Sequence, residues 1–340
     1  MKNKRPETEA LWIGGEGGME AELIKREGIA FGTIPAAGLH GVGLRALPRN
    51  VSQLSKGVLA SRKILREFKP DVLFFTGGYV AGPMALAGRR IPTLLFVPDI
   101  EPGLALKSLA RFADRIAVTA EESQKYFSRK VVVTGYPLRT DLTEWTKQNA
   151  RQTLKLDDDL PVLLIVGGSK GARSINQVVV PNLPTLLDMA QVVHISGQLD
   201  WEVVQTARSG LTSVHRTRYH AFPYLHEEMG AALASADLVL ARAGASTLGE
   251  FPFFGLPAIL VPYPYAWRYQ KVNADYLAQR GAAVVVKDEL LKSELLDVVK
   301  ALVENPTKRN AMRTAMKSLA RARAADVIAE QLFELGGQRL

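Results

Sequence analysis

In the second half of the chain, glycines and hydroxyl residues cluster at two places where a strand is expected to run into a helix. The first, residues 164–173, reads LIVGGSKGAR. Glycines let the backbone approach a ligand closely, and unpaired N–H groups at a helix start favour a diphosphate. Ser169 could add a hydroxyl donor. The alternative is a tight turn without a ligand, and the Gly-Lys-Ser/Thr ending of a Walker A loop is absent.

The second stretch, residues 241–250, reads ARAGASTLGE and adds a carboxylate. Glu250 could accept hydrogen bonds from both ribose hydroxyls of a nucleotide, while Ser246 and Thr247 donate to phosphate. The structural alternative is a capping box, because Thr247 and Glu250 have its spacing and Glu250 could satisfy N–H groups of its own helix. The residues alone leave both interpretations open.

Other polar residues also follow predicted strands. Gln270 and Asn273 fall on the first turns of a predicted helix, and such amides can bind sugar hydroxyls. Arg139 is a candidate partner for phosphate or uracil, with a solvated arginine at a domain hinge as the alternative. The aspartates at 157–159 match a metal-binding string, but they fall in a connecting segment. We interpret them as a solvated turn and predict no essential metal or other cofactor.

These residues must be positioned by the surrounding elements, which alternate between short β-branched runs and amphipathic segments of helical length. That alternation is typical of βαβ units and parallel sheets, and therefore of an α/β fold. The predicted strands form two series: residues 10–13, 29–34, 72–75, 93–96, 116–119 and 131–134, then 162–166, 192–195, 215–219, 238–240, 258–261 and 283–286. In open α/β sheets the carboxyl ends of strands face the ligand crevice, so the glycine clusters that follow them should line one cleft.

Two series of strands predict two Rossmann-like domains. We place the first at residues 1–142 and the second at 160–320, with the polar stretch 143–159 as the linker. Residues 293–335 are predicted to form consecutive helices, broken near Asn305 and Pro306. The last of them, residues 321–340, could pack back on the first domain.

Composition narrows the class of protein. The chain of 340 residues has no cysteine, which excludes disulfides and thiolate nucleophiles. Its 43 basic and 34 acidic residues give a net charge of +9, which suits an anionic partner such as phosphate groups or an anionic membrane face. The basic residues match no recognisable nucleic-acid-binding module, so we predict no nucleic-acid partner. No apolar stretch reaches the ~18 residues needed to span a bilayer, and the first ten residues contain no signal-peptide core.

One segment, residues 45–69, could touch a membrane surface. Its basic residues are interleaved with apolar ones, and a basic amphipathic helix can lie on anionic lipid. The alternative is an ordinary crossover helix with a solvated basic face. The basic residues are Arg45, Arg49, Lys56, Arg62, Lys63, Arg66 and Lys69.

Taken in order across both halves, these segments resemble the MurG-type N-acetylglucosaminyltransferases of peptidoglycan synthesis, in glycosyltransferase family 28. The resemblance is carried by residues 18–21, 38–43, 76–83, 103–115, 135–141, 167–176, 242–250 and 270–274. It implies a GT-B fold, in which two Rossmann-like domains face each other across a cleft. The N-terminal domain would take the lipid acceptor and the C-terminal domain the UDP-sugar.

The resemblance also assigns residues to the substrates. On the donor side it places Ser169 at the phosphates, Arg139 near the nucleotide, Ala245, Ser246 and Thr247 in the donor pocket, Glu250 on ribose and Gln270 on the sugar. The backbone near Leu225 or His226 would hold uracil. On the acceptor side it places Thr76, Gly77, Gly78, Tyr79 and Asp99. It assigns no catalytic base, and Asp99 is the candidate.

Three departures from the family pattern matter. The chain begins after the strand and histidine-bearing glycine loop with which the family opens. We interpret this as a mis-called start or a truncated gene rather than a redesigned enzyme. As given, the chain would lack the central strand of the first sheet. Asp99 replaces a neutral amide, and Trp267 and Arg268 replace an acidic pair before the donor glutamine.

The implied reaction is inverting transfer of N-acetylglucosamine from UDP-GlcNAc to the muramyl C4 hydroxyl of undecaprenyl-pyrophosphoryl-MurNAc-pentapeptide. It would occur on the cytoplasmic face of the cell membrane, with the enzyme bound peripherally. Rival readings are a related GT-B transferase with another lipid or glycan acceptor, a UDP-GlcNAc 2-epimerase, and a catalytically incomplete UDP-sugar-binding protein.

Overall fold

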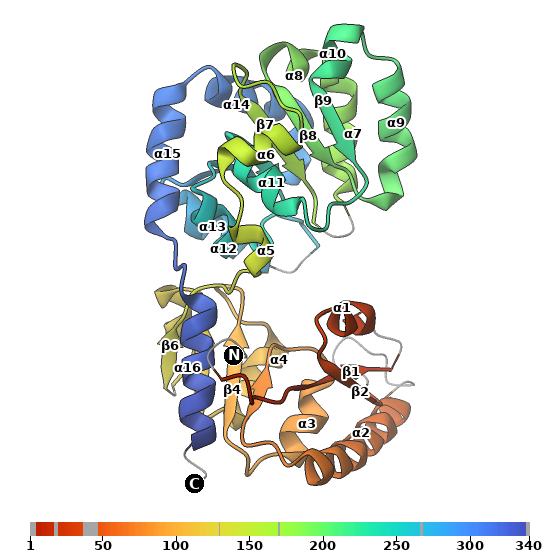
Figure 1. Ribbon diagram of the computed structural model, residues 1–340, viewed down its shortest axis with the longest axis vertical. Coiled ribbons are helices and arrows are strands. Elements are labelled where there is room, and N and C mark those ends of the chain that lie inside the picture. Colours follow the sequence, from red (N-terminus) through yellow and green to blue (C-terminus); the bar gives the residue numbers. More distant parts are fainter. Residues whose placement is uncertain are drawn as a thin grey trace. The chain divides into compact units, whose positions relative to one another are not determined.

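The computed structural model describes residues 5–16, 20–36, 47–128, 130–168, 171–265 and 268–337. These residues form two compact units, each an α/β arrangement of parallel strands and helices (Figure 1). The first comprises residues 1–98, 102–134 and 325–340, and the second comprises residues 99–101 and 135–324. The chain therefore enters the second unit briefly at residues 99–101 before its main crossing at Gly135.

The first unit contains two parallel sheets. Strands β1 (Leu11–Gly15) and β2 (Ala30–Ile34) pair with each other, and the other four strands pair in chain order. These four are β3 (Leu73–Phe75), β4 (Thr93–Val97), β5 (Arg115–Val118) and β6 (Val131–Val133). Side chains from both sheets, including Ile34 of β2 and Phe75 of β3, share one apolar core.

Helices complete the first unit. They are α1 (Glu20–Arg26), α2 (Leu47–Phe68), α3 (Ala81–Ala87), α4 (Leu104–Leu109), η2 (Ala110–Phe112), η3 (Glu121–Tyr126) and α16 (Ala324–Gly337). The last helix belongs to this unit from residue 325 onward, and Arg115 of β5 donates to Gln331 of α16 at 2.7 Å. Within α2, Ala60, Ile64 and Leu65 pack against the apolar core.

The second unit is built on one six-stranded parallel sheet with the order β12-β11-β10-β7-β8-β9. The strands are β7 (Val162–Val166), β8 (Gln191–Ile195), β9 (Tyr219–Phe222), β10 (Leu238–Ala241), β11 (Ala258–Leu260) and β12 (Ala283–Val285). Apolar runs such as VLLIV in β7 form the middle of the sheet, because helices cover both faces and exclude water from it. Strand order reverses beside β7, as in a Rossmann sheet.

Amphipathic spacing explains the helices around this sheet. In α14 (Leu291–Val303), for example, Leu291, Leu295, Val299 and Leu302 recur on one face and are buried in the core. Helix α15 (Pro306–Ser318) begins as predicted, because the Asn305 side chain accepts from the Lys308 N–H at 2.9 Å and Pro306 occupies the first turn.

The remaining helices of the second unit follow in chain order. They are α5 (Thr140–Thr143), α6 (Lys147–Thr153), α7 (Arg173–Val179), η4 (Val180–Asn182), α8 (Leu183–Met189), η5 (Gln198–Asp200), α9 (Trp201–Ser209), α10 (Ser213–Thr217), α11 (Met229–Ser235), α12 (Thr247–Phe254), α13 (Tyr269–Ala278) and η6 (Asp288–Leu290). Helices α9 and α10 pack against β9 (Figure 1).

Two sequence-based boundaries differ from the structure. The strand predicted at residues 215–219 is wrong, because Thr212 caps a helical turn by accepting from the His215 N–H at 3.2 Å. Strand β9 begins only at Tyr219. The stretch predicted as a linker, 143–159, forms part of the second unit. It contains α6, whose start is a capping box between Thr146 and Asn149.

Candidate functional site

Both glycine turns start from neighbouring strands at the same edge of the second unit's sheet. Strands β7 and β10 are paired in parallel with Val166 opposite Ala241, so the turns that follow leave adjacent positions. This pair lies where the strand order reverses, which is the place where open α/β sheets bind ligands. The central expectation from the sequence, that the two turns meet at one sheet end, is confirmed.

The first turn requires its glycines for steric reasons. A Cβ on Gly167 would lie 2.2 Å from the Ala172 nitrogen, and one on Gly171 would lie 2.3 Å from the Ser196 carbonyl oxygen. Gly168 and Gly171 also have positive φ angles of 87° and 77°. The turn is therefore packed against the end of β8. The donor-phosphate candidate Ser169 lies outside the described residues.

The second turn leads into α12 and shows what Glu250 contacts. The Thr247 hydroxyl donates to the Gly244 carbonyl at 2.6 Å, and Ser246 donates to the Glu250 carboxylate at 3.2 Å. The capping box that Thr247 and Glu250 could have formed is absent, since neither side chain caps a backbone N–H of this described helix. Ala245 lies in the same turn, where its carbonyl accepts from the Leu248 N–H. Glu250 is thus oriented by a hydroxyl.

Arg139 lies close to Glu250 although 111 positions separate them in the sequence. Burial raises the pKa of the Glu250 carboxyl, and the Ser246 hydrogen bond and the Arg139 charge oppose that rise. Arg139 donates to the carbonyl of His226 at 3.4 Å and pairs with Asp141 at 3.3 Å. The structure therefore brings together three of the predicted nucleotide-side positions: Arg139, Glu250 and the backbone at His226.

Tyr136 was not predicted to belong to this group. Burial, with the charges of Glu250 and Asp99, raises the pKa of its phenol to about 12. A Cβ on Gly249 would lie 2.8 Å from the Cβ of Tyr136, so the missing side chain at Gly249 lets Tyr136 pack against α12. The glycine before Glu250 was the available sequence signal for this contact.

Asn273 connects three chain segments from the interior of the unit. Its side chain is fully buried; Oδ1 accepts from the Ile100 N–H at 3.1 Å, and Nδ2 donates to Asp99 at 2.8 Å and to the Ala243 carbonyl at 3.1 Å. Both polar ends of the amide therefore have partners within the protein, and the expectation that it binds a sugar hydroxyl stays a prediction. Burial raises the pKa of Asp99, and the bond from Asn273 partly offsets that rise.

Gln270, the predicted sugar ligand, lies one turn before Asn273 on α13. Its Oε1 accepts from the Tyr263 N–H at 2.9 Å, which fixes the orientation of the amide. Nearby, Arg268 pairs with the buried Glu101 at 2.6 Å. Trp267, the other residue that departs from the family's acidic pair, lies outside the described residues.

The other acceptor-side candidates lie in the first unit. Thr76 follows β3, and Gly77 and Gly78 have φ angles of 111° and 82°, so the chain turns sharply there. Tyr79 is 65% exposed. Asp99 alone among the predicted acceptor-side residues is counted with the second unit.

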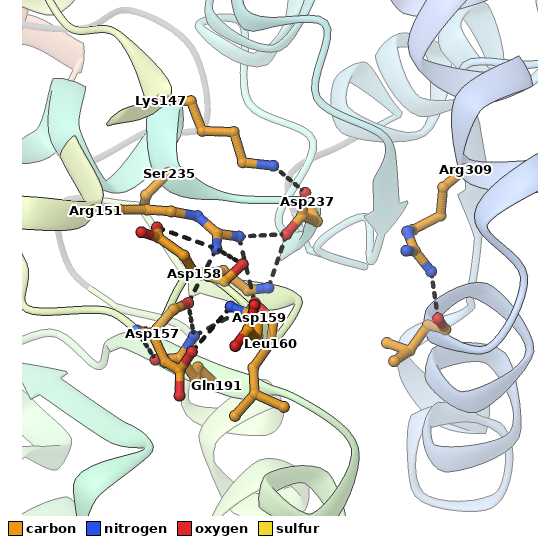
Figure 2. A network of polar contacts seen from close by, with 12 residues as sticks. Lys147, Arg151, Asp157, Asp158, Asp159, Leu160, Gln191, Ser235, Asp237 and Arg309 are labelled. Atoms are coloured by element: carbon orange, nitrogen blue, oxygen red, sulfur yellow. Dashed lines mark hydrogen bonds and ion pairs between the residues drawn. The ribbon is translucent and has the colours of Figure 1, made fainter. Parts of the chain in front are cut away.

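The aspartates at 157–159 belong to a polar network rather than a ligand set. Arg151 of α6 donates to the carbonyls of Asp157 and Asp158, and Gln191 bonds the backbone of Asp157 in both directions (Figure 2). Across the part of the chain that the structure describes, no three His, Cys, Asp or Glu side chains gather as metal ligands would. Likewise, no helix among the described residues is long and apolar enough to cross a membrane.

Two protein-family models match the chain, one in each half. Residues 1–118 match the glycosyltransferase family 28 N-terminal domain, and residues 162–330 match the family 28 C-terminal domain. Two curated relatives are named UDP-N-acetylglucosamine–N-acetylmuramyl-(pentapeptide) pyrophosphoryl-undecaprenol N-acetylglucosamine transferase. That of Roseiflexus sp. is 39% identical over 94% of this chain and 82% of its own length. That of Desulforudis audaxviator is 38% identical over 99% and 93%.

Solved structures agree with the fold. The crystal structure of Acinetobacter baumannii MurG matches with a TM-score of 0.77 at 27% identity, covering 98% of this chain and 93% of that one. A Neisseria meningitidis UDP-GlcNAc 2-epimerase bound to UDP-GlcNAc matches at 16% identity with a TM-score of 0.67, covering 96% and 91%. The second likeness concerns the fold alone.

Proposed function

This chain belongs to glycosyltransferase family 28, and we propose from that membership that it transfers N-acetylglucosamine from UDP-GlcNAc to undecaprenyl-pyrophosphoryl-MurNAc-pentapeptide. The product is the β-linked disaccharide lipid, lipid II, formed from lipid I. One observation carries the site assignment: the turns after β7 and β10 leave paired strands at the point where the sheet order reverses. Ligands in open α/β sheets bind there.

On the donor side, Glu250 accepts hydrogen bonds from the ribose hydroxyls. Its carboxylate is already oriented by Ser246 and faces the charge of Arg139. Arg139 lies beside the His226 carbonyl, which suits a contact with uracil or phosphate in the same pocket. Backbone N–H groups of the glycine turn, with Ser169, take the diphosphate, and Ala245, Ser246 and Thr247 line the pocket. Gln270 holds the sugar by donating from Nε2.

In the chemical step, the muramyl C4 hydroxyl attacks the anomeric carbon and UDP leaves with the bonding electrons. A base must accept the hydroxyl proton, and Asp99 is our candidate because its partly desolvated carboxylate has a raised pKa. Thr76, Gly77, Gly78 and Tyr79 form the acceptor side. Backbone N–H groups and Arg139 stabilise the charge on the departing diphosphate, so the reaction needs no metal or other cofactor.

The lipid acceptor places the enzyme at the cytoplasmic face of the cell membrane. Helix α2 supports this part of the proposal, because its core-facing residues leave a basic outer face with Lys56, Arg62, Lys63 and Arg66 exposed. Leu59, 63% exposed, lies among them. Such a face attracts anionic lipid headgroups. Of the predicted basic segment, Arg45 lies outside the described residues.

Measuring UDP release tests the activity. Release that requires both UDP-GlcNAc and the undecaprenyl-linked acceptor, together with formation of the disaccharide lipid, is the expected result. Conversion of UDP-GlcNAc to its C2 epimer without acceptor, whether the sugar stays on UDP or is released by water, would instead support the epimerase reading. Tight binding of UDP-GlcNAc with no turnover on any lipid acceptor would support a binding protein and contradict the proposal.

A further inference from the structure

Next to Gly171 runs a line of buried hydrogen bonds that contains none of the proposed substrate-binding side chains. His194 of β8 is fully buried between Tyr219 of β9 and Asn176 of α7. Its Nδ1 lies 2.8 Å from the Tyr219 hydroxyl, and its Nε2 lies 3.0 Å from Asn176 Oδ1. Asn176 then reaches Ser196 and Asp200, both at 2.8 Å.

The partners of these groups determine where each proton lies. Asn176 Nδ2 faces two acceptors, the Ser196 carbonyl and the Asp200 carboxylate, so Oδ1 is the atom that faces His194. An amide oxygen can only accept, which puts the imidazole proton on Nε2. Nδ1 is then an acceptor, and the Tyr219 hydroxyl donates to it. Each donor thus faces an acceptor, and all the hydrogen bonds run in the same direction, from Tyr219 through His194 and Asn176 to Ser196 and Asp200.

His194 remains neutral in this arrangement. Burial lowers the pKa of its imidazole to about 4, although the charge of Asp200 opposes that change. Near neutral pH the imidazole therefore carries one proton and bridges a donor and an acceptor. A protonated ring would instead present two donors and lose the bond from Tyr219.

The last two acceptors of the line, Ser196 and Asp200, contact Gly171 and Arg173. The Ser196 carbonyl that Asn176 binds is the atom against which Gly171 packs, since a Cβ there would lie 2.3 Å from it. Asp200, the other acceptor, pairs with Arg173 Nε at 3.2 Å in the first turn of α7. A displacement of Asn176 would thus move both the Ser196 carbonyl, against which Gly171 packs, and the Asp200 carboxylate, which binds Arg173.

We propose that Asn176 and His194 are positioning residues for the donor diphosphate, holding Gly171, where the glycine turn ends, and the Arg173 side chain in place against the end of β8. This inference rests on the proposed function, in which that turn receives the diphosphate. The proposal assigns Asn176 and His194 to the diphosphate part of UDP-GlcNAc. Binding of the diphosphate should therefore depend on these two residues, whereas binding of the uridine, held at Glu250 and His226, should not.

The test compares UDP with uridine as calorimetric ligands for Asn176→Ala. Removing the amide breaks three hydrogen bonds, and we expect UDP affinity to fall about tenfold while uridine affinity stays unchanged. The KM for UDP-GlcNAc should rise by a similar factor. His194→Gln should retain most of the UDP affinity, because a glutamine can accept from Tyr219 through Oε1 and donate to Asn176 through Nε2. Asn176→Ser, whose shorter side chain cannot span His194, Ser196 and Asp200 together, provides the same comparison if Asn176→Ala does not fold.

Val204→Ala is the matched control. Val204 is fully buried in the same apolar core but has no place in the hydrogen-bond line, so its loss destabilises the unit without touching the turn. The control should leave the ratio of UDP to uridine affinity unchanged. Equal weakening of UDP and uridine by Asn176→Ala, or no weakening in a folded variant, would overturn the inference. Wild-type protein that fails to bind UDP would instead contradict the proposed function.

Discussion

Ser246 donates its hydroxyl proton to the carboxylate of Glu250 at 3.2 Å, one turn along α12. This bond separates two roles for Glu250 that the sequence left open, because the carboxylate is oriented by a side chain and does not cap the helix. An oriented carboxylate next to the turn after β10 is suited to accept two ribose hydroxyls. The consequences can be measured by binding alone, without the lipid acceptor.

Glu250→Ala should weaken UDP-GlcNAc binding by about 1 to 3 kcal/mol, the cost of losing charge-assisted hydrogen bonds. Calorimetric titration with UDP-GlcNAc measures this loss directly. Glu304→Ala removes an exposed glutamate of the same unit and serves as the control, with unchanged affinity expected. Unchanged affinity in folded Glu250→Ala would exclude the ribose contact.

The pH dependence of binding offers a separate check on Glu250. Its pKa is raised in the free protein, and ribose donors favour the ionised form, so binding should lower that pKa. The affinity for UDP-GlcNAc, which has no terminal phosphate that titrates in this range, should therefore fall as the pH is lowered through the raised pKa, above the ordinary glutamate value of about 4.3. Glu250→Gln should show weak affinity without this dependence. A wild-type affinity that is flat from neutral pH down to that ordinary value would contradict the assignment.

Asp99→Asn should lower the transfer rate by at least about a hundredfold, the usual contribution of a general base, and leave UDP affinity unchanged. Because burial raises the pKa of Asp99, the wild-type rate should decline as pH falls through that raised value, when the carboxyl becomes protonated. Steady-state rates with saturating UDP-GlcNAc across pH measure both effects. A variant as active as wild type, with the same pH profile, would show that Asp99 is not the base.

The sequence was sufficient for the α/β class and for the meeting of the two glycine turns. Glycines mark strand ends, and the parallel βαβ pattern brings those ends to one edge. Side-chain partners were harder to foresee. Asn273 has the type and place of a sugar ligand, yet its contacts with Ile100 and Ala243 depend on how three distant segments pack. The same holds for His194, whose partners depend on the register of β8 beside β9.

Local composition also gave wrong predictions for two segments, residues 215–219 and 143–159. The β-branched residues near His215 favour a strand, but Thr212 caps a helical turn there and the strand starts later. The polar stretch before β7 was interpreted as a linker because of its composition. Its charged residues are used instead to satisfy the buried Asp237, a pairing that only the folded unit reveals.

Asp237 leads to a prediction about stability rather than catalysis. Lys147 and Arg151 donate to its carboxylate at 2.5 and 2.9 Å, and the Val162 N–H donates at 3.0 Å (Figure 2). Asp237→Asn removes the nearer, buried anionic partner of Arg151 and should destabilise the protein by about 3 kcal/mol in urea unfolding. Asp158→Asn, at an exposed side chain 3.9 Å from Arg151, should change little.

The dependence of the unfolding free energy on acidic pH distinguishes the ion pairs of Asp237 from a contribution of apolar packing alone. Burial alone would raise the pKa of Asp237, but the bond and charge of Lys147, the Val162 N–H and Arg151 hold it below its usual range. The stabilisation is therefore fully present above the unfolded-state value of about 3.9 and is lost as pH falls through the lower folded-state pKa. Asp237→Asn should make this dependence on acidic pH less steep. An equally steep dependence in the variant would contradict the assignment.

Helix α2 leads to the last prediction, which concerns the membrane. Replacing Lys56, Arg62, Lys63 and Arg66 with alanine removes four exposed charges but leaves Ile64 and Leu65 packed on the core. A basic residue near an anionic surface contributes about 1 kcal/mol, so binding to vesicles containing phosphatidylglycerol should weaken at least about tenfold. Wild-type binding should also weaken as salt is added.

The matched control removes the same number of charges from the second unit, at the exposed Lys287, Lys292, Lys300 and Lys308. If net charge alone drove binding, both variants would lose affinity equally, and a specific membrane face on α2 would be excluded. Transfer to a soluble, short-chain acceptor should be unaffected in the α2 variant, because none of the four residues lies among the proposed substrate contacts. Loss of activity on that soluble acceptor would show that α2 acts on catalysis and not only on membrane docking.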